Sequence, residues 1–93
     1  MPIRLDKPWL PLDEPTVSRL TGQLGVYEIA DGEGRTVYIG YAGGRSLFGL
    51  RGIMQEHCRT RTGTGAQFRC EVNSQYMSRW RELLMVHIAD HGA

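Results

Sequence analysis

Several features that would place a protein in a specialised class are missing from this sequence. Its 93 residues include only two cysteines, Cys58 and Cys70, which are too few for a disulfide framework and do not have the spacing of zinc ligands. No apolar run approaches the ~20 residues needed to cross a bilayer, and the first residues lack the apolar core of a signal peptide. We therefore expect one cytoplasmic domain over residues 1–93, with both cysteines as buried free thiols and no membrane partner.

The sequence also contains few histidines and carries a small net charge. Of the three histidines, His87 and His91 lie four residues apart but lack the acidic neighbour of a zinc-protease motif. We interpret this pair as surface residues near the end of a helix. The formal net charge is only +1 at pH 7, and a value so close to zero does not by itself indicate a nucleic-acid partner.

The charges are nevertheless distributed unevenly. Residues 1–34 carry three basic and six acidic side chains, whereas residues 45–69 carry five arginines and one acid, Glu56. Arginine is the side chain best shaped for bidentate contacts with phosphate. The second segment therefore predicts a basic patch that binds the backbone of a nucleic acid. Its candidate binding residues are Arg45, Arg59, Arg61 and Arg69.

Apolar patterning predicts an α+β fold. Residues 25–30 and 36–40 are rich in β-branched and aromatic side chains and flank a turn that contains two glycines, so they should pair as an antiparallel hairpin. Residues 67–72 alternate in polarity and should add a third strand. We therefore expect a small three-stranded antiparallel sheet flanked by helices.

Three helices are expected around this sheet. The acids and the proline of residues 13–15 are typical of a helix start. Ser46 is a candidate N-cap for a second helix, and a third should cover residues 75–91. Residues 1–14, with three prolines, should form an extended lead-in that Trp9 anchors to the core.

The predicted hairpin carries two tripeptides that match a known family. Residues 25–27 read Gly-Val-Tyr and residues 38–40 read Tyr-Ile-Gly. This pair resembles the motifs of the GIY-YIG nuclease superfamily, with Val26 in place of the usual isoleucine. Both tripeptides, their order and the hairpin-sized gap match, and the likeness extends from about residue 25 to residue 92. The resemblance implies a GIY-YIG-like fold and a metal-dependent endonuclease that hydrolyses DNA phosphodiester bonds.

The resemblance also implies a set of catalytic residues. Tyr27 would accept a proton, and Tyr38 would orient the attacking water or the scissile phosphate. An unperturbed tyrosine has a pKa of about 10, so Tyr27 could act as a base only if nearby cations lowered that pKa. An arginine and a histidine of the following helix would join them, with Arg45 as the alternative arginine. The implied catalytic residues are Tyr27, Tyr38, Arg51, His57 and Glu82.

Glu82 would also hold the metal. The residues from Glu82 to Val86 resemble the glutamate of the family and the apolar residues that follow it. A carboxylate is a natural ligand for Mg²⁺ (or Mn²⁺), the expected cofactor, and no organic cofactor is expected. An alternative stays open, because a helical wheel places Glu82 away from the apolar stripe of its helix. There it would be a surface charge paired with Arg79 or Arg81.

Two other functions remain as alternatives. The chain could be a non-catalytic nucleic-acid-binding module that retains the GIY-YIG fold, because a phosphate-binding surface needs only arginines and backbone amides. A small interaction protein with an exposed tryptophan is less favoured, since Trp9 and Trp80 are more typical of a core. DNA is the expected partner. Any specificity for a particular DNA sequence would come from this domain, from a homo-oligomer or from a partner protein.

Overall fold

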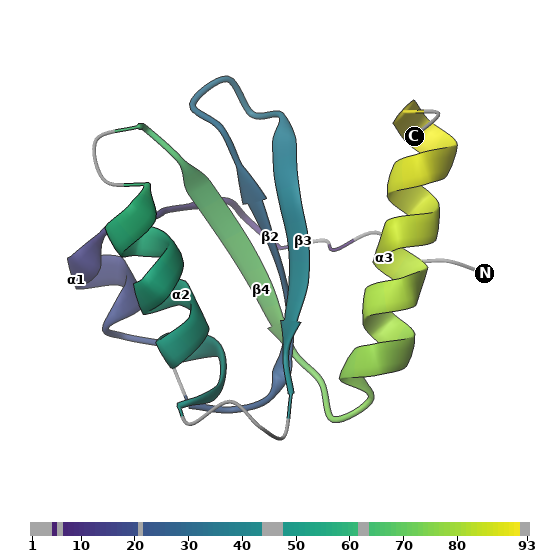
Figure 1. Cartoon of the computed structure of the whole chain (residues 1–93), viewed down its shortest axis with the longest axis horizontal. Coiled ribbons are helices and arrows are strands. Elements are labelled where there is room, and N and C mark those ends of the chain that lie inside the picture. Colours follow the sequence, from purple (N-terminus) through teal and green to yellow (C-terminus); the bar gives the residue numbers. More distant parts are fainter. Residues whose placement is uncertain (1–4, 6, 21, 44–47, 62–63, 92–93) are drawn as a thin grey trace.

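An antiparallel sheet forms the centre of the protein and carries helices on both faces (Figure 1). The computed structural model describes residues 5, 7–20, 22–43, 48–61 and 64–91. In chain order the elements are β1 (Leu10–Pro11), α1 (Glu14–Val17), β2 (Gly25–Ala30), β3 (Thr36–Ala42), α2 (Gly49–Thr60), β4 (Gln67–Val72) and α3 (Tyr76–His91). The strand order is β1-β4-β2-β3, so β2 is an inner strand and β3 is an edge of the four-stranded sheet.

The hairpin of β2 and β3 is closed by the side chain of Asp31. Its Oδ1 atom accepts hydrogen bonds from the backbone N–H groups of Glu33 and Arg35, both at 2.9 Å. Gly34 supplies the positive φ of 87° that the turn requires. The antiparallel hairpin predicted from the sequence is therefore confirmed.

Helices cover both faces of the sheet, which explains why every residue of β2 is buried. On one face, Tyr27 and Ile29 pack with Leu50 and other residues of α1 and α2. On the other face, Val26 packs with Leu83 of α3. Alternate residues of β2 thus point to opposite layers. We call these layers the α2 face and the α3 face of the sheet (Figure 1).

The sheet has one strand more than the sequence predicted. Leu10 and Pro11, expected within an extended lead-in, pair with Phe68 and Gln67 of β4. Proline is tolerated at this position because an edge strand can lack one backbone donor. The short strand covers part of the otherwise open edge of β4. The prediction of three strands was wrong because two residues carry too little pattern to identify a strand.

Trp9, next to this short strand, does not insert into the core. It is half-buried, and the Arg69 Cζ atom lies 4.2 Å from the centroid of its ring. The tryptophan therefore anchors the lead-in through a cation–π contact. Neither cysteine forms a disulfide within the described residues; Cys58 is buried as expected, whereas Cys70 is only half-buried.

Side-chain caps precede two of the helices, whereas α2 begins after Phe48, which makes no side-chain cap hydrogen bond. Asp13 accepts a hydrogen bond from the N–H of Thr16 at 3.0 Å and caps α1, and Asn73 accepts one from the N–H of Gln75 just before α3. Ser46, the predicted cap of α2, lies outside the described residues. None of the helices in the described part of the chain has the length and apolar character needed to span a bilayer.

Gly25, the first residue of β2, tests the contact between the two inner strands. A Cβ atom at this position would overlap the carbonyl oxygen of Glu71 on β4, so Gly25→Ala must displace one strand from the other. We expect the substitution to lower the free energy of unfolding by about 1 to 3 kcal/mol in urea denaturation. Gly32→Ala is the matched control, because a Cβ there meets its nearest atom at 3.5 Å. The control should change stability by less than about 0.5 kcal/mol. Equal stability of the two variants would show that the close approach of β2 to β4 does not require a glycine at position 25.

Candidate functional site

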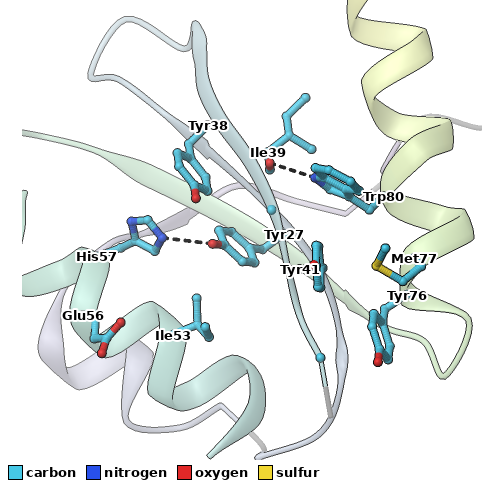
Figure 2. Close-up of a pocket in the computed structure, with 12 residues that line it drawn as sticks. Tyr27, Tyr38, Ile39, Tyr41, Ile53, Glu56, His57, Tyr76, Met77 and Trp80 are labelled. Carbon is cyan, nitrogen blue, oxygen red and sulfur yellow. Dashed lines mark hydrogen bonds between the residues drawn. The ribbon is translucent and has the colours of Figure 1, made fainter. Parts of the chain in front are cut away.

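A pocket of about 740 Å³ lies at the free edge of β3 (Figure 2). This volume is typical of a ligand site. Residues from both faces of the sheet line the pocket, because successive residues of the edge strand point to opposite sides. We divide its lining into two parts. The tyrosine–histidine half contains Tyr27, Tyr38, Gly40, Ile53, Glu56 and His57, and the aromatic half contains Ile39, Tyr41, Gly43, Tyr76, Met77 and Trp80.

The tyrosine–histidine half brings together three of the five implied catalytic residues. The Tyr27 hydroxyl oxygen lies 3.0 Å from His57 Nε2. The Tyr38 ring stacks on the Tyr27 ring, with 5.9 Å between centroids and 6° between planes, and its centroid lies 4.8 Å from that of His57. Tyr27 is only 3% exposed, whereas Tyr38 is 44% exposed. The Tyr27–His57 pair therefore forms the floor of the pocket, and Tyr38 stands at its mouth (Figure 2).

The second tripeptide supplies the space that the Tyr27 ring needs. Gly40 is the cross-strand partner of Tyr27. A Cβ atom at Gly40 would lie 2.5 Å from the Tyr27 hydroxyl oxygen, so any side chain there would displace this oxygen from His57. The glycine of the Tyr-Ile-Gly tripeptide thus has a direct role in the geometry of the pair.

The packing of α2 brings His57 to the same place. Leu50, Met54 and Cys58 are the larger buried side chains of this helix, and they hold it against the sheet. His57 follows Met54 by three positions, which places it on the same side of the helix, at the border of the buried stripe. The imidazole can therefore reach Tyr27 while it remains half-buried.

Burial controls the protonation of the pair. It raises the pKa of the Tyr27 hydroxyl well above the ordinary value of about 10, and Tyr38 and Glu56 add to this effect. Burial, followed by the positive charge of Arg61, lowers the pKa of His57. At neutral pH Tyr27 is therefore protonated and His57 is neutral, and we assign the Tyr27 O–H as the donor to His57 Nε2. Tyr27 could act as a base by itself only if cations lowered its pKa, and the structure shows the opposite shift.

Arg51 does not belong to this half of the pocket. It lies six residues before His57 on α2, which corresponds to about 120° around a helix, and it does not line the pocket. Arg45, the alternative arginine, lies outside the described residues. The structure therefore places Arg51, the preferred arginine, outside the lining of the pocket that holds the two phenols.

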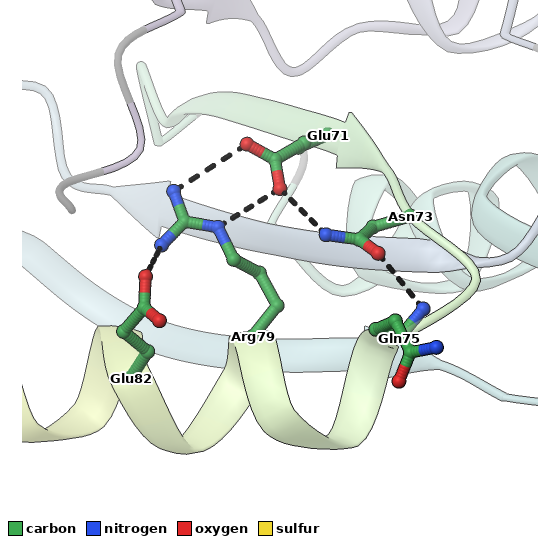
Figure 3. Close-up of polar contacts among 5 residues, drawn as sticks. All are labelled: Glu71, Asn73, Gln75, Arg79 and Glu82. Carbon is green, nitrogen blue, oxygen red and sulfur yellow. Dashed lines mark hydrogen bonds and ion pairs between the residues drawn. The ribbon is translucent and has the colours of Figure 1, made fainter. Parts of the chain in front are cut away.

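Glu82 lies across the sheet from the two phenols. Its carboxylate accepts a hydrogen bond from Arg79 at 2.6 Å, and Arg79 also donates to Glu71 of β4 at 2.8 Å (Figure 3). Glu71 is the cross-strand partner of Val26, whose side chain packs on the α3 face. The structure thus contains the ion pair with Arg79 that the sequence left open as an alternative, and Glu82 does not meet the tyrosine–histidine half.

The carboxylate in the pocket is Glu56, which the resemblance did not select. Glu56 is exposed on α2 next to His57. The described residues hold no group of three or more His, Cys, Asp or Glu side chains that could bind a metal. Mg²⁺ binds proteins through as few as one or two carboxylates and keeps several waters, so Glu56 fits a ligand at this pocket and Glu82 does not. A signal existed in the sequence, since Glu56 is the one acid of the basic segment 45–69.

Of the four arginines that the sequence assigned to a basic patch, Arg59 lies in the last turn of α2 and Arg61 directly follows it, whereas Arg45 lies outside the described residues. Arg59 is exposed there, and the Nε atom of Arg61 is buried without a hydrogen-bond partner in the described part of the chain. Arg69 lies on the other face of the sheet, where its Nε atom is 3.3 Å from the carboxylate of Glu28. Arg69 therefore lies on the α3 face, and its charge is balanced locally by Glu28.

The pocket thus combines a proton-accepting imidazole, a buried phenol and an exposed phenol. A family model described as "Domain of unknown function (DUF7508)" matches residues 1–90, and the chain belongs to this family. No curated protein and no solved structure matches the chain. The family description names no activity, so the geometry of the pocket is the basis for a proposed function.

Proposed function

We propose that this protein is a GIY-YIG-like endonuclease that hydrolyses phosphodiester bonds of DNA. The observation that carries the proposal is the convergence of Tyr27, Tyr38 and His57 in one pocket. The two tripeptides behind the resemblance lie on the paired strands β2 and β3, where Tyr27 of one is opposite Gly40 of the other. One tripeptide supplies the buried phenol, and the other supplies the exposed phenol and the space for the pair.

The Tyr27–His57 pair supports hydrolysis through a proton relay. A neutral imidazole can act as a general base near neutral pH, whereas a phenol of raised pKa cannot do so alone. As the oxygen of a water molecule bonds to phosphorus, a water proton passes to the Tyr27 oxygen and the Tyr27 proton passes to His57 Nε2. The scissile P–O bond breaks, and the leaving oxygen takes up a proton from solvent. His57 then releases its proton to solvent, which restores the resting pair.

Tyr38 is the side chain placed to hold the phosphate. It is exposed at the mouth of the pocket, where its hydroxyl can donate a hydrogen bond to a phosphoryl oxygen. Arg61 lines a different pocket, next to Trp9, and acts on the pair only through its positive charge, which lowers the pKa of His57. The relay therefore operates next to one hydrogen-bond donor for a phosphodiester.

We propose Mg²⁺ (or Mn²⁺) as the cofactor, with Glu56 rather than Glu82 as its protein ligand. Glu56 is the carboxylate in the lining of the pocket, whereas Glu82 is engaged by Arg79 on the other side of the sheet. When bound, such a cation neutralises charge on the phosphoryl oxygens.

A second candidate is a nucleic-acid-binding module without catalysis. The positions of Arg51 and Glu82 favour it, because two of the five implied catalytic residues lie away from the phenols. Such a module would bind the DNA backbone through the arginines of α2, and its affinity would fall steeply with salt. It would not turn over any DNA substrate.

Substitution of His57 separates the two candidates. We expect His57→Gln to lower the rate of DNA cleavage in Mg²⁺ about 10²- to 10⁴-fold, because glutamine can accept the Tyr27 hydrogen bond but cannot take up the proton. Cleavage would be measured on a panel of single-stranded, branched and duplex DNA. His87→Gln is the matched control, since His87 lies outside this pocket, and it should cleave at the wild-type rate. Equal rates for the two variants would contradict the relay, and DNA binding by a wild-type protein that cleaves no substrate would favour the second candidate.

A pair of glutamate substitutions identifies the metal ligand. We expect Glu56→Gln to raise the Mg²⁺ concentration needed for half-maximal cleavage, because it removes the carboxylate of the pocket. Glu82→Gln should keep the wild-type Mg²⁺ dependence and lower stability only modestly, because it weakens a partly exposed ion pair with Arg79. The opposite result, loss of cleavage in a folded Glu82→Gln protein alone, would restore the assignment implied by the resemblance.

A further inference from the structure

The aromatic half of the pocket has no part in the proposed proton relay. Three rings meet there, from β3 and the first turns of α3 (Figure 2). The Tyr41 ring stacks on the Tyr76 ring with 5.6 Å between centroids and 18° between planes. Its centroid also lies 5.2 Å from that of the Trp80 ring, and these two rings are in an edge-on arrangement. This cluster lies in the same pocket as Tyr38, so one ligand can touch both halves.

The cluster is held in place by the edge of the sheet. The Trp80 indole donates a hydrogen bond from Nε1 to the carbonyl oxygen of Ile39 at 3.1 Å. Trp80 and Tyr76 also pack on the core of the α3 face. Two rings are thus fixed before any ligand binds, which lowers the entropic cost of a contact with them.

Part of the same cluster stays open to solvent. Tyr41 is 36% exposed, and Met77 beside it is 39% exposed. Packing of the α3 face uses Trp80 and Tyr76, but it does not bury these two apolar side chains. An exposed aromatic surface inside a hollow is suited to a flat apolar ligand.

A nucleobase is the flat group that lies next to the phosphodiesters of an intact DNA strand. Aromatic side chains stack on bases of any sequence because each base has a π-face. In duplex DNA these faces are covered by neighbouring bases, so a base must be unpaired or extruded before it can stack on a protein ring. The Trp80 N–H is already used by Ile39, so the indole contributes a stacking surface rather than a hydrogen bond to a base edge.

We infer that the pocket takes unpaired DNA, with a base stacked in the aromatic half and its backbone phosphate at the tyrosine–histidine half. This inference rests on the proposed action on DNA and specifies the substrate class. On the extended β3 strand, the Cα atoms of Tyr38 and Tyr41 lie about 10 Å apart. The two halves are therefore close enough for a short stretch of single strand to contact both.

Binding by the wild-type protein tests the inference without any substitution. Fluorescence anisotropy in a metal chelator would compare three labelled probes of equal length at one salt concentration: single-stranded oligothymidine, a strand of abasic sites, and a blunt duplex. We expect the oligothymidine to bind roughly tenfold or more tightly than either other probe, because a stacked base contributes about 1–3 kcal/mol. Equal affinity for the oligothymidine and the abasic strand, tighter binding of the duplex, or no binding of any probe would overturn the inference.

Two substitutions then locate the stacking surface. Tyr41→Ala should reduce oligothymidine affinity to that of the abasic strand, whereas Tyr41→Phe should keep the wild-type value because it keeps the ring. Phe48→Ala is the matched control, since Phe48 is an exposed aromatic residue that does not line the pocket. Wild-type affinity in folded Tyr41→Ala would overturn the assignment.

The outcome is separable from that of the proposed activity. A preference for oligothymidine in a protein that cleaves nothing would support stacking and reject the nuclease. Cleavage lost in His57→Gln, with no preference for unpaired bases, would support the nuclease and reject stacking.

Discussion

The hydrogen bond between the Tyr27 hydroxyl and His57 Nε2 is the interaction on which the proposed chemistry depends. It connects an inner strand with a helix, so it requires the sheet and α2 to be packed correctly before it can form. Its burial keeps the phenol protonated and the imidazole neutral. A pair in these protonation states can move a proton without forming a phenolate at rest. In the proposed function, the fold thereby makes a tyrosine that would be a poor base into one member of a relay.

The edge position of β3 determines what else can reach this pair. An inner strand presents its two faces to separate layers, whereas a free edge allows residues from both faces to line one pocket. The α2 face contributes the Tyr27–His57 pair and Glu56, and the α3 face contributes three aromatic rings. One ligand can therefore contact both halves of the pocket, with a phosphate at the Tyr27–His57 pair and a base on the aromatic rings. The same arrangement pairs Glu82 with Arg79, which also holds β4 through Glu71.

The parts of the site that could be predicted from the sequence are those set by local pattern. Two tripeptides on paired strands define the positions of Tyr27, Tyr38 and Gly40 as soon as the hairpin is recognised. The two-residue strand β1 could not be predicted, because it exists only through its pairing with β4. The location of Arg51 could not be predicted either, since the rotation of a helix about its axis is decided by which side chains pack on the sheet, whereas the helical wheel had already offered the Glu82–Arg79 pair as an alternative. Glu56 was visible as a lone acid in a basic segment, but only the packing of α2 places it beside His57.

The pH dependence of the cleavage rate tests the proton relay most directly. The relay requires neutral His57, so the rate constant of the wild-type protein at saturating Mg²⁺ should fall as the pH is lowered through the pKa of His57. Burial and Arg61 place that pKa below the ordinary value of about 6.5, and the rate should stay constant from there up to neutral and mildly alkaline pH. A rate that instead continues to rise toward pH 10 would show that the tyrosine phenolate is the active base and would contradict the relay.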